Sequence, residues 1–466
     1  MPQKRQFDAT HSLPFDPADP KAALDELPQS PAVFALYGAD SHAEPYIGRT
    51  PHLRARLERL LQPSARHPRR LHLAGLVRRI EWQLTGSEFE SLLVQFDLLQ
   101  EVYGAKAPDQ AVARMHLRAP AFLRFLGGNP YPRIVVTHRP SQREADWAYG
   151  PFPSRAAAER FSEEALKLFH LRRCTFDLSP DPKFPGCVYS EMKMCLAPCY
   201  QGCTDERYAE EAAAVESFLA TRGEGRLVAL RTERDRASAA LEFESAAALH
   251  AQVQRVESVS ALAAEIVRPL SRLRAVILQA SARPGEVAVF LFESGRLRGP
   301  ASFSTLGMRM QNEHSGSTSL FAQPVVVAPI PENSDRRTEN SQSPSEQEVS
   351  GHGMSPAGIG PQTKGASAPE ATSAQTQETT AAAKVGRGVL EVRLEAALAD
   401  LAERSGRATP TLRQGHLALL KRWYYRSEAR RAGEIFFPDT DGRWPVKAIL
   451  HGAGRVEQNQ NSRTQA

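Results

Sequence analysis

The feature that most limits how this chain can fold is a long polar tract at residues 331–385. The tract is rich in Ser, Thr, Gln, Glu, Pro, Ala and Gly, and it contains almost no large apolar side chain. Such a segment buries too little apolar surface to offset the entropy that ordering costs, so we expect it to be disordered. We therefore expect the 466 residues, 41% of them hydrophobic, to form several modest domains and not one large core.

Three residue types near the start of the chain indicate phosphodiester hydrolysis. Tyr46 begins a Tyr-Ile-Gly-Arg string that ends at Arg49, and Arg56 and Glu90 follow it. A phenol can orient or deprotonate water, and a guanidinium can neutralise charge that grows on a phosphate. A single carboxylate can hold a divalent ion that keeps most of its water shell.

Hydrophobic spacing predicts that these residues lie on a strand and two helices. Thr50 and Pro51 are typical of an N-cap and a first helical position, and leucines then recur at helical spacing, so Arg56 falls at the edge of an apolar face. A strand pattern follows, and Ser87 begins a second helix with Glu90 in its first turn.

Simpler interpretations exist for the same residues. Ser87 and Glu90 also form a capping-box pattern, in which Glu90 only satisfies backbone donors. Arg56 taken alone is most often a solvated surface charge. Only the ordered set of Tyr46, Arg56 and Glu90 favours a nuclease.

Local charge indicates a polyanionic partner. Between Arg49 and Arg79 the sequence has nine arginines and a single acid, Glu58, although the whole chain carries only +5. A solubilising surface normally has acids interspersed with its arginines, so contact with phosphates explains this stretch better. The chain has no glycine-rich phosphate loop, and we expect no nucleotide chemistry.

The five cysteines all lie in one short window, at Cys174, Cys187, Cys195, Cys199 and Cys203. The sequence shows no cleavable leader and no apolar run long enough for a membrane span, so we expect a cytoplasmic protein, in which disulfides are uncommon. The clustered thiols are then predicted to be metal ligands, and the simpler alternative is a set of unrelated buried cysteines. Four thiolates suit zinc or an iron–sulfur cluster, and spacing alone does not separate the two.

The N-terminal residues resemble the GIY-YIG nuclease module. The resemblance implies that Tyr46 is the general base or water-orienting phenol, that Glu90 binds Mg²⁺ or Mn²⁺, and that Arg56 and Arg49 stabilise the phosphate. Three departures stand out. Phe34 occupies the place of the first-triplet tyrosine, Arg49 replaces a frequent lysine, and the asparagine that usually closes the module has no clear counterpart.

The cysteine spacing is very similar to that of the bacterial UvrC excinuclease family, which includes the shorter homologue Cho. The pattern is Cys174-x12-Cys187-x7-Cys195-x3-Cys199, and it lies within Pro-Gly-Cys and Cys-Leu-Ala-Pro-Cys strings. The resemblance implies that these four cysteines hold a [4Fe-4S] cluster, with zinc as the alternative. Cys203 lies outside the pattern.

Residues 237–247 resemble the UVR motif, a helical hairpin through which UvrC docks onto UvrB. The resemblance implies that partner contacts come from Leu241, Phe243, Glu244, Ala246 and Ala247. An ordinary amphipathic hairpin that packs within the protein is the alternative. His250 and Ala251 depart from the usual Arg-Asp of the family.

Beyond residue 265 the resemblance becomes weaker. Three strand patterns between residues 273 and 303 predict an antiparallel meander, similar to the segment that precedes the RNase H-like nuclease in UvrC, and we expect that nuclease to be missing. The C-terminal region interleaves basic and aromatic residues at 421–426 and is basic again at Arg430 and Arg431. This pattern suits single-stranded or distorted DNA, and equally a small core that contains Trp423 and Tyr424.

The resemblance therefore implies an α/β (α+β) fold whose first domain has a small mixed sheet flanked by helices. The expected segments are an N-terminal segment (1–28), a GIY-YIG nuclease-like domain (29–110), a linker region with the cysteine cluster (111–204), a helical region with the UVR motif (205–265), a β meander (266–325), a disordered linker (326–386) and a helical basic C-terminal region (387–466). The implied activity is one metal-dependent incision in damaged double-stranded DNA during nucleotide excision repair, after docking on a UvrB-like helicase. The alternative is a catalytically weak or inactive adaptor that binds DNA and UvrB.

Overall fold

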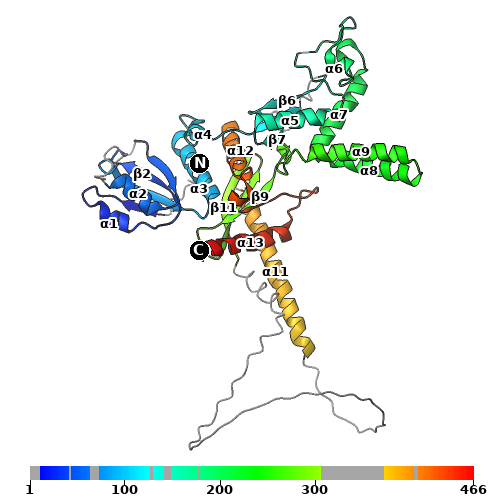
Figure 1. Ribbon diagram of the computed structural model, residues 1–466. Coiled ribbons are helices and arrows are strands. Elements are labelled where there is room, and N and C mark those ends of the chain that lie inside the picture. The colour runs from blue at the N-terminus through cyan, green and yellow to red at the C-terminus, as the bar shows by residue number, and fades with distance from the viewer. Residues whose placement is uncertain are drawn as a thin grey trace, which may run out of the picture. The chain divides into compact units, whose positions relative to one another are not determined.

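The computed structural model describes residues 11–40, 43–62, 73–125, 130–140, 148–176, 178–305, 372–403 and 408–465. Contacts divide the chain into two units, residues 1–307 with 390–466, and residues 308–389. In the second unit the structure describes only residues 372–389, which form the first part of helix α11 (Thr372–Glu403). All that follows on sheets and sites concerns the first unit (Figure 1).

The N-terminal part contains a four-stranded sheet. Its strands are β1 (His11–Pro14), β2 (Ala32–Gly38), β3 (Tyr46–Thr50) and β4 (Val77–Leu84), in the order β1-β4-β2-β3. Every pair is antiparallel, so the expectation of a mixed sheet was wrong. A short connection joins β2 to β3 as a hairpin. Helix α1 connects β1 to β2, and α2 connects β3 to β4. Neither of these two pairs is adjacent in the sheet, so the helical connections create no parallel pair.

Helices cover both faces of this sheet, because successive side chains of the inner strand β2 point to opposite faces. Helices α1 (Pro20–Asp25) and α2 (Leu53–Leu61) pack on the face that carries Phe34 and Leu36. Helix α3 (Glu88–Tyr103) places Val94 and Leu98 on the other face. Helix α2 begins at Leu53 and not at Pro51, because Thr50 still belongs to β3.

A second antiparallel sheet follows in the middle of the chain. It has the order β6-β5-β7-β8, from β5 (Ala121–Phe125), β6 (Ile134–Thr137), β7 (Ala148–Phe152) and β8 (Arg268–Pro269), with helices α4 (Gln110–Arg114) and α5 (Arg155–Leu166). Phe122, Phe152 and Phe161 are fully buried in its core. Next come α6 (Val188–Glu191), a 3-10 turn (Pro198–Tyr200) and α7 (Asp205–Thr221).

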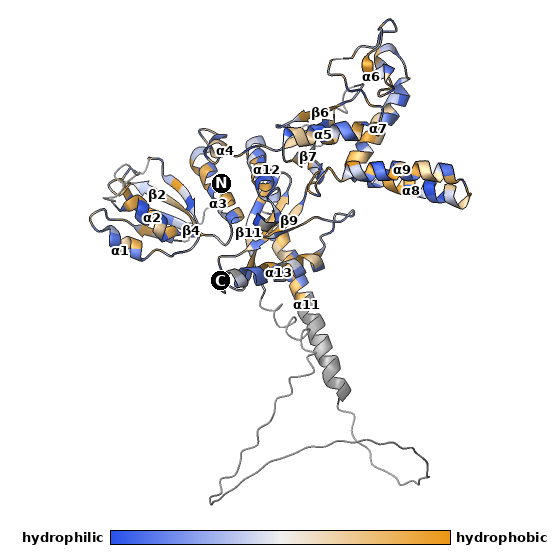
Figure 2. Ribbon diagram, in the orientation of Figure 1, coloured by the Kyte–Doolittle hydropathy of each residue, from blue (hydrophilic) through white to orange (hydrophobic). Residues whose placement is uncertain are grey.

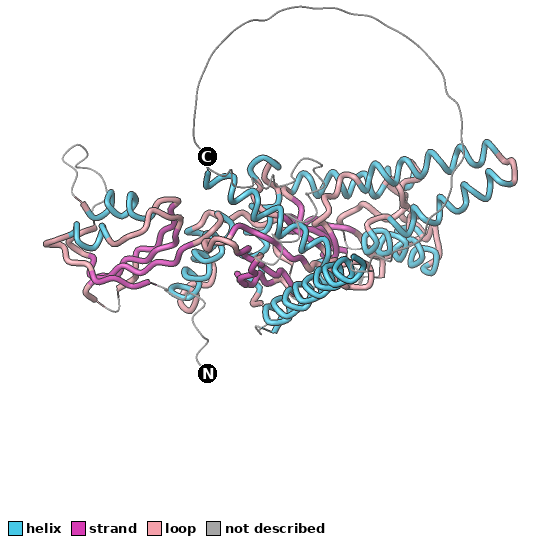
Figure 3. Tube along the Cα trace, turned by 90° about the horizontal axis from the view of Figure 1, so that it is seen from below, coloured by secondary structure: helices cyan, strands magenta, loops and turns pink. Residues whose placement is uncertain are grey.

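Helices α8 (Glu224–Ala239) and α9 (Phe243–Ser260) form a hairpin, side by side in both views (Figures 1 and 3). The Arg231 guanidinium pairs with Glu257 across it at 2.7 Å. None of the helices described in this structure is both long and apolar enough to cross a membrane.

The third sheet combines the meander with the C-terminal region. Its order is β11-β10-β9-β12, from β9 (Ala275–Ala280), β10 (Glu286–Glu293), β11 (Arg296–Ser304) and β12 (Glu434–Phe436), with helices α12 (Pro410–Tyr424) and α13 (Val446–Gln465). Ile435 of β12 pairs with Ile277 of β9. Trp423 is 3% exposed, so it is a core residue of this region.

The predicted linker differs from the structure at its end. Residues 326–371 lie outside the described residues, but helix α11 already begins at Thr372, inside the segment expected to be disordered. Alanines are frequent from this point and proline is absent, which favours helix. The described sheets and helices confirm the α/β (α+β) class.

Candidate functional site

Tyr46 and Arg56 lie together on one face of the N-terminal sheet. Tyr46 begins β3, and Arg56 lies on α2, which covers that face. Arg56 Nη2 donates to the Tyr46 hydroxyl at 3.5 Å, which is a long contact. The Thr50 hydroxyl accepts the His52 N–H at 3.1 Å and so holds the turn that leads into α2.

Phe34 fills the space beside Tyr46. It is 1% exposed, and its ring centroid lies 6.2 Å from that of Tyr46. Phe34 pairs with Gly48 across the hairpin, and a Cβ added at Gly48 would come within 2.7 Å of the Phe34 ring. Gly48 of the Tyr-Ile-Gly string is therefore needed to make room for the Phe34 ring. Phe34 gives the site an aromatic ring but no hydroxyl group.

Glu90 is buried and bonded to backbone. It is 5% exposed, and its Oε2 accepts the Gly86 N–H at 2.8 Å. The Ser87 hydroxyl in turn accepts the Glu90 N–H at 3.1 Å. These two bonds match the predicted capping box except in one respect. The Gly86 N–H, and not the Ser87 N–H, donates to the Glu90 carboxylate. Burial raises the pKa of Glu90 to about 7, and the Gly86 N–H opposes this rise.

Arg49 contacts helix α3 and not Arg56. Its Nη1 lies 3.6 Å from Glu88 Oε1. The same carboxylate accepts two bonds from Arg426 of the C-terminal region, at 2.7 and 2.8 Å. Burial lowers the pKa of Arg49, and the charge of Glu88 counteracts that effect.

The structure thus brings together only some of the predicted site residues. Tyr46 and Arg56 touch, whereas within the described part of the chain no contact joins Glu90 to either of them. Sequence reasoning missed Glu88 and Arg426. They are 338 positions apart, and no local pattern indicates their pairing.

In the cysteine region, the thiol of Cys195 interacts electrostatically with those of Cys174, Cys187 and Cys199. Burial, the largest cause, and the charges of Cys174, Cys199 and Cys187 together raise the pKa of Cys195 to about 11, and the Ala197 N–H opposes this rise. The Ala197 N–H donates to Cys195 Sγ at 3.3 Å, and Arg172 Nη1 lies 3.6 Å from Cys174 Sγ. All five cysteines are free.

The described residues contain no group of three or more His, Cys, Asp or Glu side chains that is arranged to hold a metal ion. The four thiols nevertheless supply the donor type that an iron–sulfur cluster or zinc needs. In iron–sulfur proteins, N–H donors toward the cysteine sulfurs tune the reduction potential of the cluster, and the Ala197 N–H makes a bond of this type to Cys195.

The end of the α8–α9 hairpin is apolar and exposed. Leu241 is 71% exposed and Phe243 is 67% exposed, and Figure 2 shows hydrophobic colouring at this tip. Glu244 and Ala247 are also exposed, and Ala246 is half-buried. The C-terminal half of α9 is instead packed against the protein, and its Val253, Val256 and Val259 are buried.

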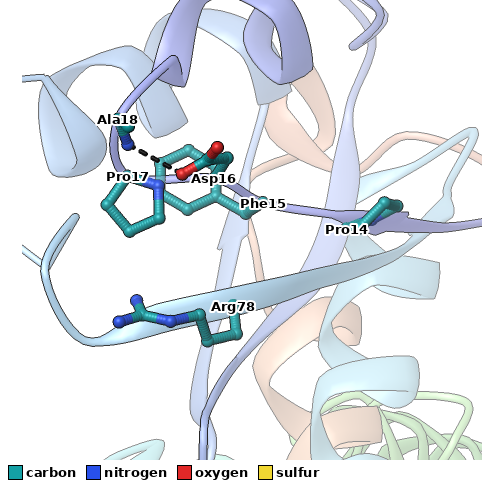
Figure 4. A pocket seen from close by; sticks show the side chains of 6 residues that line it. All are labelled: Pro14, Phe15, Asp16, Pro17, Ala18 and Arg78. Atoms are coloured by element: carbon teal, nitrogen blue, oxygen red, sulfur yellow. Dashed lines mark hydrogen bonds between the residues drawn. The ribbon is translucent and has the colours of Figure 1, made fainter.

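A separate pocket of about 610 Å³ lies beside β1 (Figure 4). It is lined by Pro14, Phe15, Asp16, Pro17, Ala18 and Arg78. Asp16 Oδ1 accepts the Ala18 N–H at 2.9 Å, and the Arg78 guanidinium donates to backbone carbonyls. Since β1 and β3 form opposite edges of the sheet, this pocket is not part of the Tyr46 site.

Comparison with known proteins gives a family match for a segment in the middle of the chain. Residues 122–218 match the family model of the UvrC/Cho excinuclease, middle domain. The chain is thus related to the excinucleases over that segment.

Curated relatives extend the likeness. The UvrABC system protein C of Alcanivorax borkumensis is 30% identical over 241 residues, which cover 52% of this chain and 39% of the relative. That of Desulforudis audaxviator is 29% identical over 323 residues, 67% of this chain and 51% of the relative. That of Klebsiella pneumoniae is 28% identical over 249 residues, 53% and 39% respectively. No solved structure matches the chain.

The protein that these comparisons indicate is UvrC, and they confirm the predicted likeness to it. The chain is UvrC-like over about half to two thirds of its length. It spans about two fifths to one half of the length of these relatives.

Proposed function

We propose that this chain acts in nucleotide excision repair as a UvrC- or Cho-like endonuclease that makes one metal-dependent incision in damaged duplex DNA. The contact between Tyr46 and Arg56 carries the proposal, because it places a phenol beside a guanidinium on one face of the sheet. The arginine-rich stretch that begins at Arg49 supplies affinity for the phosphate backbone. Likeness to UvrC supports the repair role.

In this mechanism Tyr46 orients or deprotonates the attacking water, and Arg56 stabilises charge on the phosphate. Glu90 is the side chain that would hold Mg²⁺ or Mn²⁺, which supplies Lewis-acid stabilisation when bound. One oxygen of Glu90 accepts the Gly86 N–H, so only its other oxygen would be available to an ion, and that ion would keep most of its water shell. Glu90 must also be ionised, and its raised pKa predicts that metal-dependent activity increases from about pH 6 to about pH 8.

The same proposal assigns the other two features of the chain. Cys174, Cys187, Cys195 and Cys199 would hold a [4Fe-4S] cluster, with zinc as the alternative. The exposed tip with Leu241 and Phe243 would dock onto a UvrB-like helicase, since two large apolar side chains exposed on one hairpin end are unusual without a partner.

Two observations favour a second function, an adaptor with weak or no catalysis that binds DNA and UvrB. Phe34 removes one hydroxyl beside Tyr46, and Glu90 is engaged with backbone. A nicking assay on a lesion-bearing duplex with cognate UvrA and UvrB separates the two functions. Metal-dependent nicks that Tyr46→Phe abolishes support the nuclease, and binding to DNA and UvrB without nicks supports the adaptor.

A further inference from the structure

The C-terminal region contributes to a cavity of about 570 Å³ beside helix α3. Arg49, Thr50 and Ser87 line it from the N-terminal part, and Arg426 and Arg430 line it from the C-terminal part. Both parts belong to the same compact unit. The cavity shares Arg49 with the predicted nuclease residues, but Tyr46, Arg56 and Glu90 do not line it.

Positive charge dominates this cavity. Glu88 is the only acid among its lining residues, and it already pairs with Arg426 and lies 3.6 Å from Arg49. Burial is the main cause that lowers the pKa of Arg49, and the charges of Arg422 and Arg426 lower it further. Within the described residues the Arg430 side chain makes no hydrogen bond or ion pair, and it is exposed. A bound anion would relieve the mutual repulsion of these guanidinium groups.

The lining indicates which part of a nucleic acid would be recognised. Phe89 and Trp423 reach the cavity, but each is only 3% exposed and their rings pack on one another at 5.3 Å, so they offer no open face for base stacking. The Ser87 hydroxyl accepts the Glu90 N–H and keeps its own proton for a ligand. Arginines and a hydroxyl without a stacking platform suit a phosphate better than a stacked base.

We infer that this cavity binds one backbone phosphate of a DNA strand, with Arg426 and Arg430 completing a site that Arg49 begins. The inference rests on the proposed function in that DNA is the source of the phosphate. Glu88 competes with the phosphate for Arg49 and Arg426, so it sets the affinity from within the protein. The C-terminal region thereby positions the strand beside the nuclease-like module.

The test measures binding of a fluorescent duplex oligonucleotide by anisotropy across a series of salt concentrations, without partners or metal. Arg430→Gln removes one phosphate contact and is expected to weaken binding several-fold and to reduce the salt slope by about 1. Glu88→Gln frees two arginines and is expected to tighten binding, a result that a folding defect would not produce. Arg455→Gln is the matched control, because Arg455 pairs with Glu434 and does not line the cavity.

Equal salt slopes for the wild type, Arg430→Gln and Arg455→Gln would overturn the inference, as would a wild type that binds no DNA. A calorimetric titration with inorganic phosphate distinguishes the other source of this ligand. Arg430→Gln could remove phosphate binding and leave the salt slope of DNA binding unchanged. That result would assign the cavity to a small free anion and would also overturn the inference. A wild type that shows the predicted slopes but never nicks DNA would leave the phosphate site supported and refute the proposed incision.

Discussion

Replacing Glu90 with glutamine is expected to stabilise the protein at high pH and to have no such effect at low pH. The pKa of Glu90 is raised from 4.5 to about 7, so the folded protein holds this proton over a range in which the unfolded chain has lost it. The contribution of Glu90 to the free energy of unfolding is therefore fully present below pH 4.5. It is lost as the pH rises through about 7. The full cost of the ionised carboxylate is roughly 3 kcal/mol.

Glutamine keeps an oxygen that can accept the Gly86 N–H, but it carries no charge in a site that is 5% exposed. We expect the free energy of unfolding of Glu90→Gln to exceed that of the wild type by up to about 3 kcal/mol at about pH 8 and to equal it at about pH 4.5. Urea unfolding at the two pH values measures the difference. A variant that is less stable than the wild type at the higher pH would refute the reasoning.

The same pair of proteins tests whether Glu90 holds a metal ion. An ion that binds only the folded carboxylate stabilises the wild type by mass action, and Mg²⁺ or Mn²⁺ should therefore raise its unfolding free energy at about pH 8. Glu90→Gln should not respond to the ion. An equal response of both proteins would assign the ion to another place and leave Glu90 with its backbone role.

Three further predictions concern other parts of the chain. Phe34→Tyr should raise the single-turnover nicking rate by on the order of 10²-fold without changing DNA affinity, and Tyr46→Phe in that background should abolish the gain; an inert Phe34→Tyr would favour the adaptor. Anaerobically purified protein should contain iron and sulfide that Cys187→Ala loses and Cys203→Ala retains, and stoichiometric zinc without sulfide would contradict the cluster. Deletion of residues 331–371 should leave the melting temperature of the remaining protein unchanged; a drop of several degrees would show that this segment is structured.

Local sequence patterns predicted the helix with Arg56, the strand that follows it and the helix with Glu90, because their residues alternate or recur at regular spacing. They did not predict strand β1 or helix α1, which lie within residues 1–28. The helix with Glu90 begins after Ser87 as its capping residue indicated. The residues around Tyr46 form a strand, and leucines place α2 over it. The same pattern did not distinguish a metal ligand from a capping carboxylate, since both roles require Glu90 in the first turn.

Long-range pairings could not be predicted from such patterns. Strand β12 has only three residues, and its place beside β9 depends on partners that are distant in the sequence, as Ile435 and Ile277 are. The bonds between Arg426 and Glu88 have the same origin, because nothing near either residue in sequence signals the other. These contacts arise when separate segments pack, and they determine where the candidate phosphate site lies.

The most direct test of the proposed incision is a nicking assay with Glu90→Gln on a lesion-bearing duplex, in the presence of cognate UvrA, UvrB and Mg²⁺ or Mn²⁺. If Glu90 is the ligand of the catalytic ion, the variant should lose incision and keep nearly unchanged DNA affinity, because affinity comes from the arginines. Metal-dependent incision by Glu90→Gln at the wild-type rate would contradict the proposed role of Glu90.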